Sequence, residues 1–168
     1  MPLEPRPGMT VPIPCRHCEK SLIRFSVAEG AHSVAIGIPE NLTLRRGNEF
    51  GYGAHEIDLA QEIRDMVLVQ TDYDVLPAGD ADLTAEVQIV SYDTPFLVAD
   101  AADRPLVSNV SIEVRLVLRR RDGSVAFEGT TTKVGYLVPS RDEDEGTARA
   151  EAFEKIAQWV VNRLKADW

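Results

Sequence analysis

The stretch VSIEVRLVL, residues 110–118, decides the fold because apolar side chains occupy every second position along it. In an extended chain, successive side chains point to opposite faces, so Val110, Ile112, Val114 and Leu116 share one face. The residues between them are mostly polar or charged. This period of two predicts a β-strand with one face in the core and the other in water.

The continuation RRRDGSV, residues 119–125, predicts a tight turn after this strand. Asp122 and Gly123 are the pair that a two-residue type I′ hairpin prefers, because both of its central residues need positive φ. We therefore predict a returning strand from Val125 to Tyr136.

Two more strands are expected earlier in the chain. SVAIGIPEN, residues 33–41, places Val34, Ile36 and Ile38 on one face, and LTAEVQI, residues 83–89, alternates in the same way. A short strand is also expected between the first helix and residue 83.

Two amphipathic helices complete the pattern, because apolar residues recur there at helical spacing. The acidic run before the second helix, residues 142–145, favours helix capping over a calcium loop. The predicted stripes are Leu59, Ala60, Ile63, Met66 and Val67 in the first helix, and Phe153, Ile156, Ala157, Val160, Val161, Leu164 and Trp168 in the second.

The order of these elements, β-α-β-β-β-α, predicts the α+β class. We expect a single-domain two-layer sandwich, with a mainly antiparallel four-stranded sheet and two amphipathic helices on one face. The length of 168 residues suits one such domain. Five prolines within the first 14 residues predict an irregular N-terminal arm over residues 1–30, so the domain is expected over residues 31–168.

Composition and motifs exclude several classes of function. A net charge of −9 argues against a nucleic-acid partner. The glycines of RRGNEFGYGAH, residues 45–55, match neither a P-loop nor a dinucleotide fingerprint, and no nucleophile lies in a motif with a base. We expect no enzyme and no cofactor. Cys15 and Cys18 are a weak candidate pair for metal or redox chemistry, because the sequence has no second pair to complete a zinc site.

The polar face of the central strand carries a candidate anion site. Arg115, Arg119 and Arg121 follow one phase of the strand, and the hairpin is expected to place Thr130 beside Arg115 and Ala126 beside Arg119. Guanidinium groups bind phosphate in a fork geometry, which predicts recognition of a phosphorylated lipid. The alternative is a solubilising strip balanced by neighbouring glutamates.

In wording and in element order, the chain resembles the LPS-assembly lipoprotein family, LptE. The similar segments are SVAIGIPENLTLRRGNEF, YDVLPAGDADLTAEVQIVSY, RRRDGSVAFEG and QWVVNRLKADW, and the resemblance spans residues 33–168. The positions that match the family pattern are Asn41, Ala81, Asp82, Asp122, Gly123 and Trp168.

The resemblance implies a periplasmic subunit that plugs and helps to assemble the outer-membrane β-barrel LptD, and that helps to deliver lipopolysaccharide. Arg45, Arg46, Phe50 and Tyr52 would then contact the barrel partner, although Phe50 and Tyr52 would equally serve to cover the end of the core. The expected location is the periplasmic side of the outer membrane.

Two alternatives stay open at this level. The sequence around the two cysteines shows neither a signal peptide nor a lipobox, so it does not predict lipidation. If the native chain begins at Met1, the alternative is a soluble adaptor of another envelope or cytosolic complex, with a cytoplasmic location. The other alternative is a small metal or redox protein built on the cysteine pair.

Overall fold

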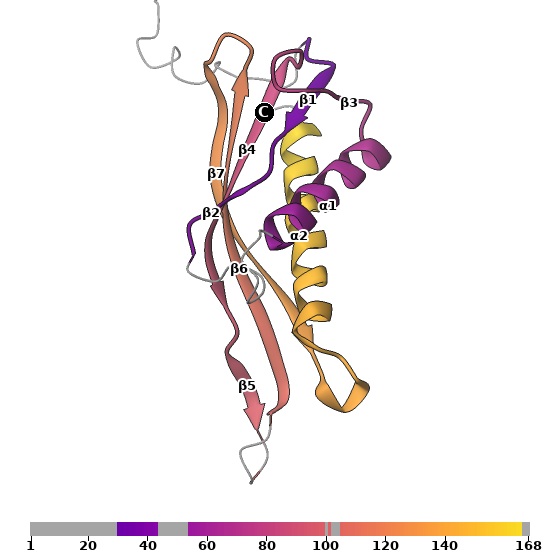
Figure 1. Ribbon diagram of the computed structural model, residues 1–168, viewed down its shortest axis with the longest axis vertical. Coiled ribbons are helices and arrows are strands. Elements are labelled where there is room, and N and C mark those ends of the chain that lie inside the picture. The colour runs from indigo at the N-terminus through magenta and orange to yellow at the C-terminus, as the bar shows by residue number, and fades with distance from the viewer. Residues whose placement is uncertain (1–29, 44–53, 100, 102–104, 166–168) are drawn as a thin grey trace, which may run out of the picture.

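The protein is an α+β structure in which two helices cover one face of a single sheet (Figure 1). The computed structural model describes residues 30–43, 54–99, 101 and 105–165. The strands are β1 (Ser33–Ile36), β2 (Glu40–Asn41), β3 (Asp74–Val75), β4 (Leu83–Asp93), β5 (Phe96–Ala99), β6 (Pro105–Arg120) and β7 (Val125–Leu137). The helices are α1 (Ala54–Gln70), the short 3₁₀ helix η2 (Pro139–Arg141) and α2 (Glu145–Lys165).

The sheet has seven strands and is mixed, which corrects the expected four-stranded, mainly antiparallel sheet. Its main path is β3-β1-β4-β6-β5, with β2 beside β4 and β7 beside β6. The long strands β4, β6 and β7 pair antiparallel as predicted. In contrast, β1 runs parallel to both β3 and β4, and β2 runs parallel to β4. The parallel pairing arises because α1 is the crossover between β1 and β4.

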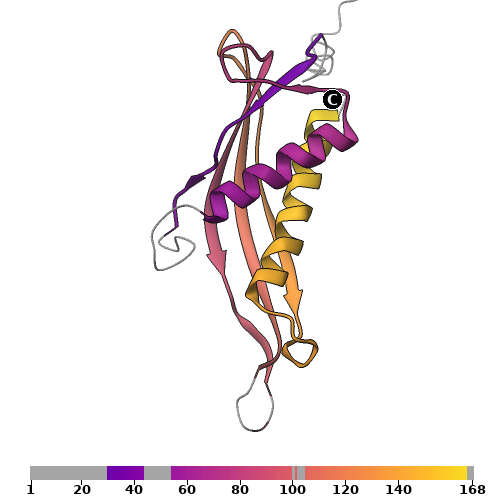
Figure 2. The same cartoon turned by 45° about the vertical axis from the view of Figure 1, so that its right-hand side comes forward.

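The predicted dry face of β6 is confirmed. Val110, Ile112, Val114, Leu116 and Leu118 each have 0% of their surface exposed. They form one core with the helical stripes, and Figure 2 shows α1 and α2 side by side over this face of the sheet. The buried helical residues in that core include Leu59, Ile63, Val67, Phe153, Ile156, Ala157, Val160, Val161 and Leu164.

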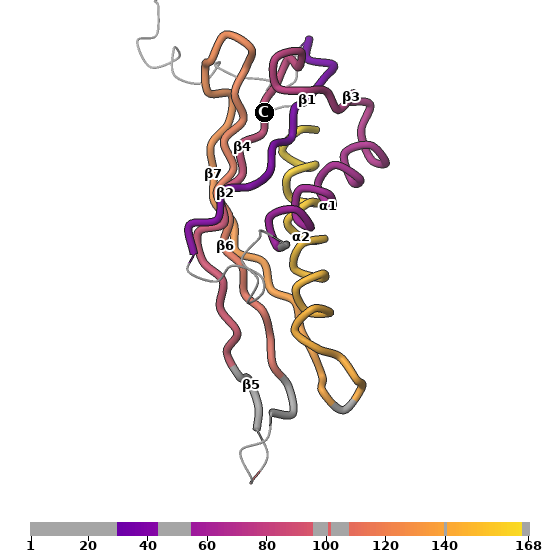
Figure 3. Tube along the Cα trace, in the orientation of Figure 1, coloured from indigo at the N-terminus to yellow at the C-terminus, as the bar shows by residue number. Residues whose placement is uncertain are grey.

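The first strand is shorter than predicted. β1 ends at Ile36, and Ile38 is 66% exposed instead of sharing the buried face. Pairing with β4 stops at Ala85 and resumes at Gln88, so three residues of this chain segment pass two residues of β4. The extra residue bends the chain away from the sheet between β1 and β2, a path that Figure 3 traces.

The β6–β7 turn differs from the predicted type I′ hairpin. Within this turn, only Gly123 has a positive φ, at 84°. Its N–H donates to the carbonyl of Arg120 at 2.8 Å, and the N–H of Arg120 donates to the carbonyl of Ser124 at 2.9 Å. The loop therefore has three residues, the arrangement in which glycine takes the left-handed position after a type I turn.

This turn also sets the register of the hairpin. Arg115 lies opposite Thr130, as predicted. Arg119 lies opposite Val125 and not Ala126, because the register shifts between Leu118 and Arg119.

The acidic run before α2 caps the helix, as expected. The Oδ1 atom of Asp144 accepts the N–H of Thr147 at 2.9 Å, and these hydrogen bonds lower the pKa of the Asp144 carboxyl. A carboxylate at this position also suits the helix dipole.

Candidate functional site

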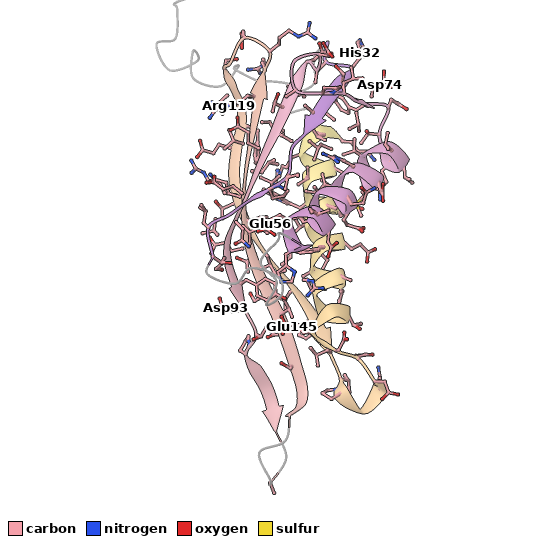
Figure 4. The ribbon with its side chains drawn as sticks, viewed as in Figure 1. His32, Glu56, Asp74, Asp93, Arg119 and Glu145 are labelled. Atoms are coloured by element: carbon pink, nitrogen blue, oxygen red, sulfur yellow. The ribbon has the colours of Figure 1, made fainter. Side chains whose placement is uncertain are left out.

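The sheet face that points away from the helices carries two of the predicted arginines. Arg115 lies on β6 and its guanidinium binds Glu128 of β7, with Nε at 3.1 Å from Oε1. The Nε of Arg119 donates to both carboxylate oxygens of Glu86 on β4 at 3.0 Å. Figure 4 shows Arg119 on the side of the sheet opposite the helices.

Both ion pairs are half exposed, with 40–49% of each side chain accessible. Exposed pairs of this kind contribute little to folding, because water competes for both charges. A phosphate that binds here would have to compete with a carboxylate for each guanidinium. Both guanidinium groups are accessible to such a ligand, because both arginine side chains are partly exposed to solvent.

Arg121 has a different environment from the other two arginines. It lies in the hairpin loop, where its Nη2 donates to the carbonyl of Asp80 at 2.5 Å and lies 3.5 Å from the carboxylate of Asp82. Its guanidinium thus holds the segment that leads into β4, and it does not extend the strip formed by Arg115 and Arg119.

A surface cavity of about 690 Å³ lies on β4 where the chain bends away between β1 and β2. Two apolar side chains on its lining are well exposed, Ile38 at 66% and Leu76 at 39%. Glu86, the partner of Arg119, also lines the cavity. The cavity, with its two exposed apolar side chains, and the arginine pairs therefore meet at Glu86, an arrangement suited to a molecule with an apolar part and an anionic part.

The Ala-Asp dipeptide of residues 81 and 82 has a structural role. Asp82 accepts the hydroxyl of Ser33 at 2.8 Å and the N–H of His32 at 3.1 Å, and its own N–H donates to Ser33 Oγ at 3.0 Å. These hydrogen bonds and the charge of Arg121 hold the pKa of Asp82 below its usual value. The dipeptide thus joins the starts of β1 and β4 to the β6–β7 turn.

Sequence reasoning missed a polar cluster where the two helices begin. His55, in the first turn of α1, is 8% exposed and stacks on Tyr92 of β4 with ring centroids 5.3 Å apart. The Tyr92 hydroxyl donates to Glu145 at 2.8 Å. Burial and this carboxylate raise the pKa of Tyr92 to about 12. A histidine and a tyrosine far apart in the sequence carry no periodic signal, so only the fold brings them together.

This cluster predicts a pH dependence of stability. Burial, followed by the charge of Arg149, lowers the pKa of His55 below 6.5, against the opposing effects of Glu56, Glu145 and Asp58. Near pH 6, His55 therefore binds a proton more readily in the unfolded chain than in the folded chain. The free energy of unfolding falls as the pH drops below about 6.5. The melting temperature should fall between pH 7 and 5, and His55→Phe should flatten this slope, because phenylalanine keeps the ring stack without titrating.

Carboxyl groups provide an internal comparison for that measurement. The pKa values of Asp82, Asp144 and Glu151 are lowered in the folded protein, so their contribution is lost only at lower pH, near and below about 4. A slope between pH 7 and 5 that is identical in the parent and His55→Phe would contradict the assignment to His55.

The other predicted site residues lie outside the described residues. These are Cys15 and Cys18 of the candidate metal pair, and Arg45, Arg46, Phe50 and Tyr52 of the candidate partner site. Within the described ranges, no three histidine, cysteine or acidic side chains gather in a way that would hold a metal ion. None of the described helices combines the length and the apolar character that crossing a membrane requires.

Comparison with known proteins gives one family. The sequence model of LptE, described as Lipopolysaccharide-assembly, matches residues 31–164. No curated protein matches the chain in sequence.

Solved structures share the fold at low sequence identity. A hypothetical protein of Chlamydia trachomatis has a TM-score of 0.55 at 12% identity, over 80% of this chain and 98% of that one. A protein of Xanthomonas campestris has a TM-score of 0.51 at 13% identity, over 80% and 81% of the two chains. These likenesses concern the fold alone.

Proposed function

Because the chain belongs to the LptE family of lipopolysaccharide-assembly proteins, we propose that it is a non-enzymatic subunit that helps to assemble and plug an outer-membrane β-barrel of the LptD type. In this role it would work on the periplasmic side of the outer membrane and take part in delivering lipopolysaccharide. The observation that carries the proposal is the family match over residues 31–164, which includes all the described strands and both helices except the last residue of α2.

We further propose that the open sheet face contacts the lipid. The exposed apolar groups Ile38 and Leu76 would lie against acyl chains or the apolar edge of the sugar lipid. Arg115 and Arg119 would bind its phosphates in place of their present partners Glu128 and Glu86. A phosphate can accept two parallel hydrogen bonds from one guanidinium group, as a carboxylate does. Arg121 would support this surface from the hairpin loop.

The segment between β2 and α1 is the proposed contact with the barrel. It carries Arg45, Arg46, Phe50 and Tyr52 and joins two elements that the structure places, β2 ending at Asn41 and α1 beginning at Ala54. Arginine and aromatic residues are enriched in the energetically dominant parts of protein interfaces, which supports this choice.

Affinity capture of the tagged full chain from its native cell envelope tests the assembly role. The expected result is recovery of one β-barrel outer-membrane protein in a stoichiometric complex that survives detergent. Depletion of the chain should lower the amount of folded barrel in the membrane. Recovery of no barrel, together with normal barrel levels after depletion, would overturn the proposed function.

Lipid contact predicts a charge-reversal effect. Arg115→Glu combined with Arg119→Glu should weaken binding of purified lipopolysaccharide roughly tenfold or more, because the phosphates would then face like charges. Binding by the parent should weaken with added salt. Titration of fluorescently labelled lipopolysaccharide measures both effects.

Arg141→Glu combined with Lys165→Glu is the matched control. It changes the net charge by the same amount at two exposed positions on η2 and α2, away from the open face. Equal loss in both double variants would show that net charge, and not the strip, governs binding. Unchanged affinity in a folded Arg115→Glu, Arg119→Glu variant would remove the strip as the lipid site.

A further inference from the structure

β7 forms an outer edge of the sheet. Among the described strands it pairs with β6 alone, and it runs for thirteen residues from Val125 to Leu137. An edge of this length exposes a row of backbone N–H and C=O groups that can accept another strand, and proteins usually block such edges.

Side chains of α2 block one end of this edge. Glu151 accepts the N–H of Tyr136 at 2.8 Å, and the ammonium of Lys155 donates to the carbonyl of Val134 at 2.7 Å. The two side chains also pair with each other at 2.6 Å. Figure 2 shows this end of β7 beside the start of α2.

The same pattern locates the outward-facing groups in the rest of β7. The register between β6 and β7 is uninterrupted from Leu137 back to Phe127. Outward and inward backbone groups alternate along a strand, so those of Thr132, Thr130 and Glu128 point outward like those of Val134 and Tyr136.

No described side chain caps the stretch from Glu128 to Thr132. The next α2 residue in the series after Glu151 and Lys155 is Trp159, which packs on Phe127 with ring centroids 6.2 Å apart. An indole has no hydrogen-bond acceptor and so cannot take the place of a carboxylate beside an N–H group. Between the blocked end and the turn, an open edge of about five residues remains, EGTTT at residues 128–132.

We propose that this open edge pairs antiparallel with the same edge of a second copy of the chain, about a two-fold axis at Thr130. The outward-facing residues then match one another, since Thr130 meets Thr130 and Glu128 meets Thr132 of the second copy. Each such pair exchanges two backbone hydrogen bonds, and the two sheets become one.

Charge favours this antiparallel self-pairing. Glu128 is the only charged residue of the open edge, and it falls opposite a neutral threonine. A parallel in-register pairing would place Glu128 beside Glu128, which is unfavourable for directly opposed like charges. The open stretches of two copies therefore match each other in length, in backbone hydrogen-bonding groups and in charge.

Sedimentation velocity of the full chain tests the proposal. The expected result is a reversible dimer with a dissociation constant of roughly 10 to 100 µM, as suits a small interface. Thr130→Pro should raise this constant roughly tenfold or more, because it removes the outward N–H at the axis without removing a bond to β6. Thr130→Val keeps the N–H group and should dimerise like the parent.

Cysteine crosslinking tests the register independently. In a chain with Cys15→Ser and Cys18→Ser, Thr130→Cys should form a disulfide-linked dimer, because residues at the axis have Cα atoms about 5.5 Å apart. Thr132→Cys should not, since it lies opposite Glu128 of the second copy.

Any of the following results would overturn the proposal. They are a parent chain that is monomeric up to about 1 mM, equal crosslinking at residues 130 and 132, or a dimer that Thr130→Pro leaves unchanged while the variant remains folded. Capture of a different protein through this edge in place of a second copy would also overturn it.

Discussion

Replacing Gly135 with alanine is expected to destabilise the protein by roughly 3 kcal/mol or more, because the added methyl group has no room. A Cβ atom at Gly135 would lie 1.7 Å from the carbonyl oxygen of Ala148 and 2.7 Å from its carbonyl carbon. Both atoms belong to the backbone of α2, which would have to move off β7. That movement would pull apart the closely packed stripe that includes Ala152 and Ile156, which are each 0% exposed.

Urea unfolding of Gly135→Ala measures this loss, with Gly37→Ala as the matched control. A Cβ at Gly37 would meet nothing within 4 Å, and Gly37 has no positive φ that would strain alanine. The control should stay within about 0.5 kcal/mol of the parent. A Gly135→Ala protein as stable as the control would mean that α2 does not approach β7 this closely.

Replacing Leu116 with alanine should cost roughly 2 to 5 kcal/mol, because it leaves a cavity at the centre of the core. Leu116 is 0% exposed, and it belongs to the core cluster that also contains buried residues of α1 and α2. Because helices and sheet enclose this position, the neighbouring side chains can move only a little into the space that the leucine leaves.

Ile38→Ala is the control for this prediction, because it removes a similar aliphatic side chain that is 66% exposed. Its effect on the free energy of unfolding should be within about 0.5 kcal/mol. Equal losses in the two variants, measured by urea unfolding, would contradict the burial of Leu116.

The sequence by itself determined the parts of the protein that depend on local periodicity. The alternation from Val110 to Leu118 identified β6 and its buried face, and the spacing from Phe153 to Leu164 identified the buried stripe of α2. Each pattern is repeated over several helical turns or strand residue pairs, so many positions indicate the same element and the same buried face. The α+β class and the two helices on one face follow from these elements.

Tertiary structure decided the features that depend on residues far apart in the chain. The crossover through α1 made β1 parallel to β4, and a single extra residue before β2 turned Ile38 outward and opened the cavity on β4. Local patterns carry no information about such offsets, because strand pairing is set by the competition between distant segments.

The candidate site divides in the same way. The sequence placed Arg115 and Arg119 on the open face, since strand phase alone requires it, and the hairpin predicted Glu128 as a nearby counter-charge, which pairs with Arg115. The partner of Arg119 is Glu86 of β4, whose register with β6 only the fold sets. The stacking of His55 on Tyr92 and the approach of α2 to Gly135 have no local signature. Local periodicity thus determined which faces are buried, whereas the packing of distant segments determined which groups meet on them.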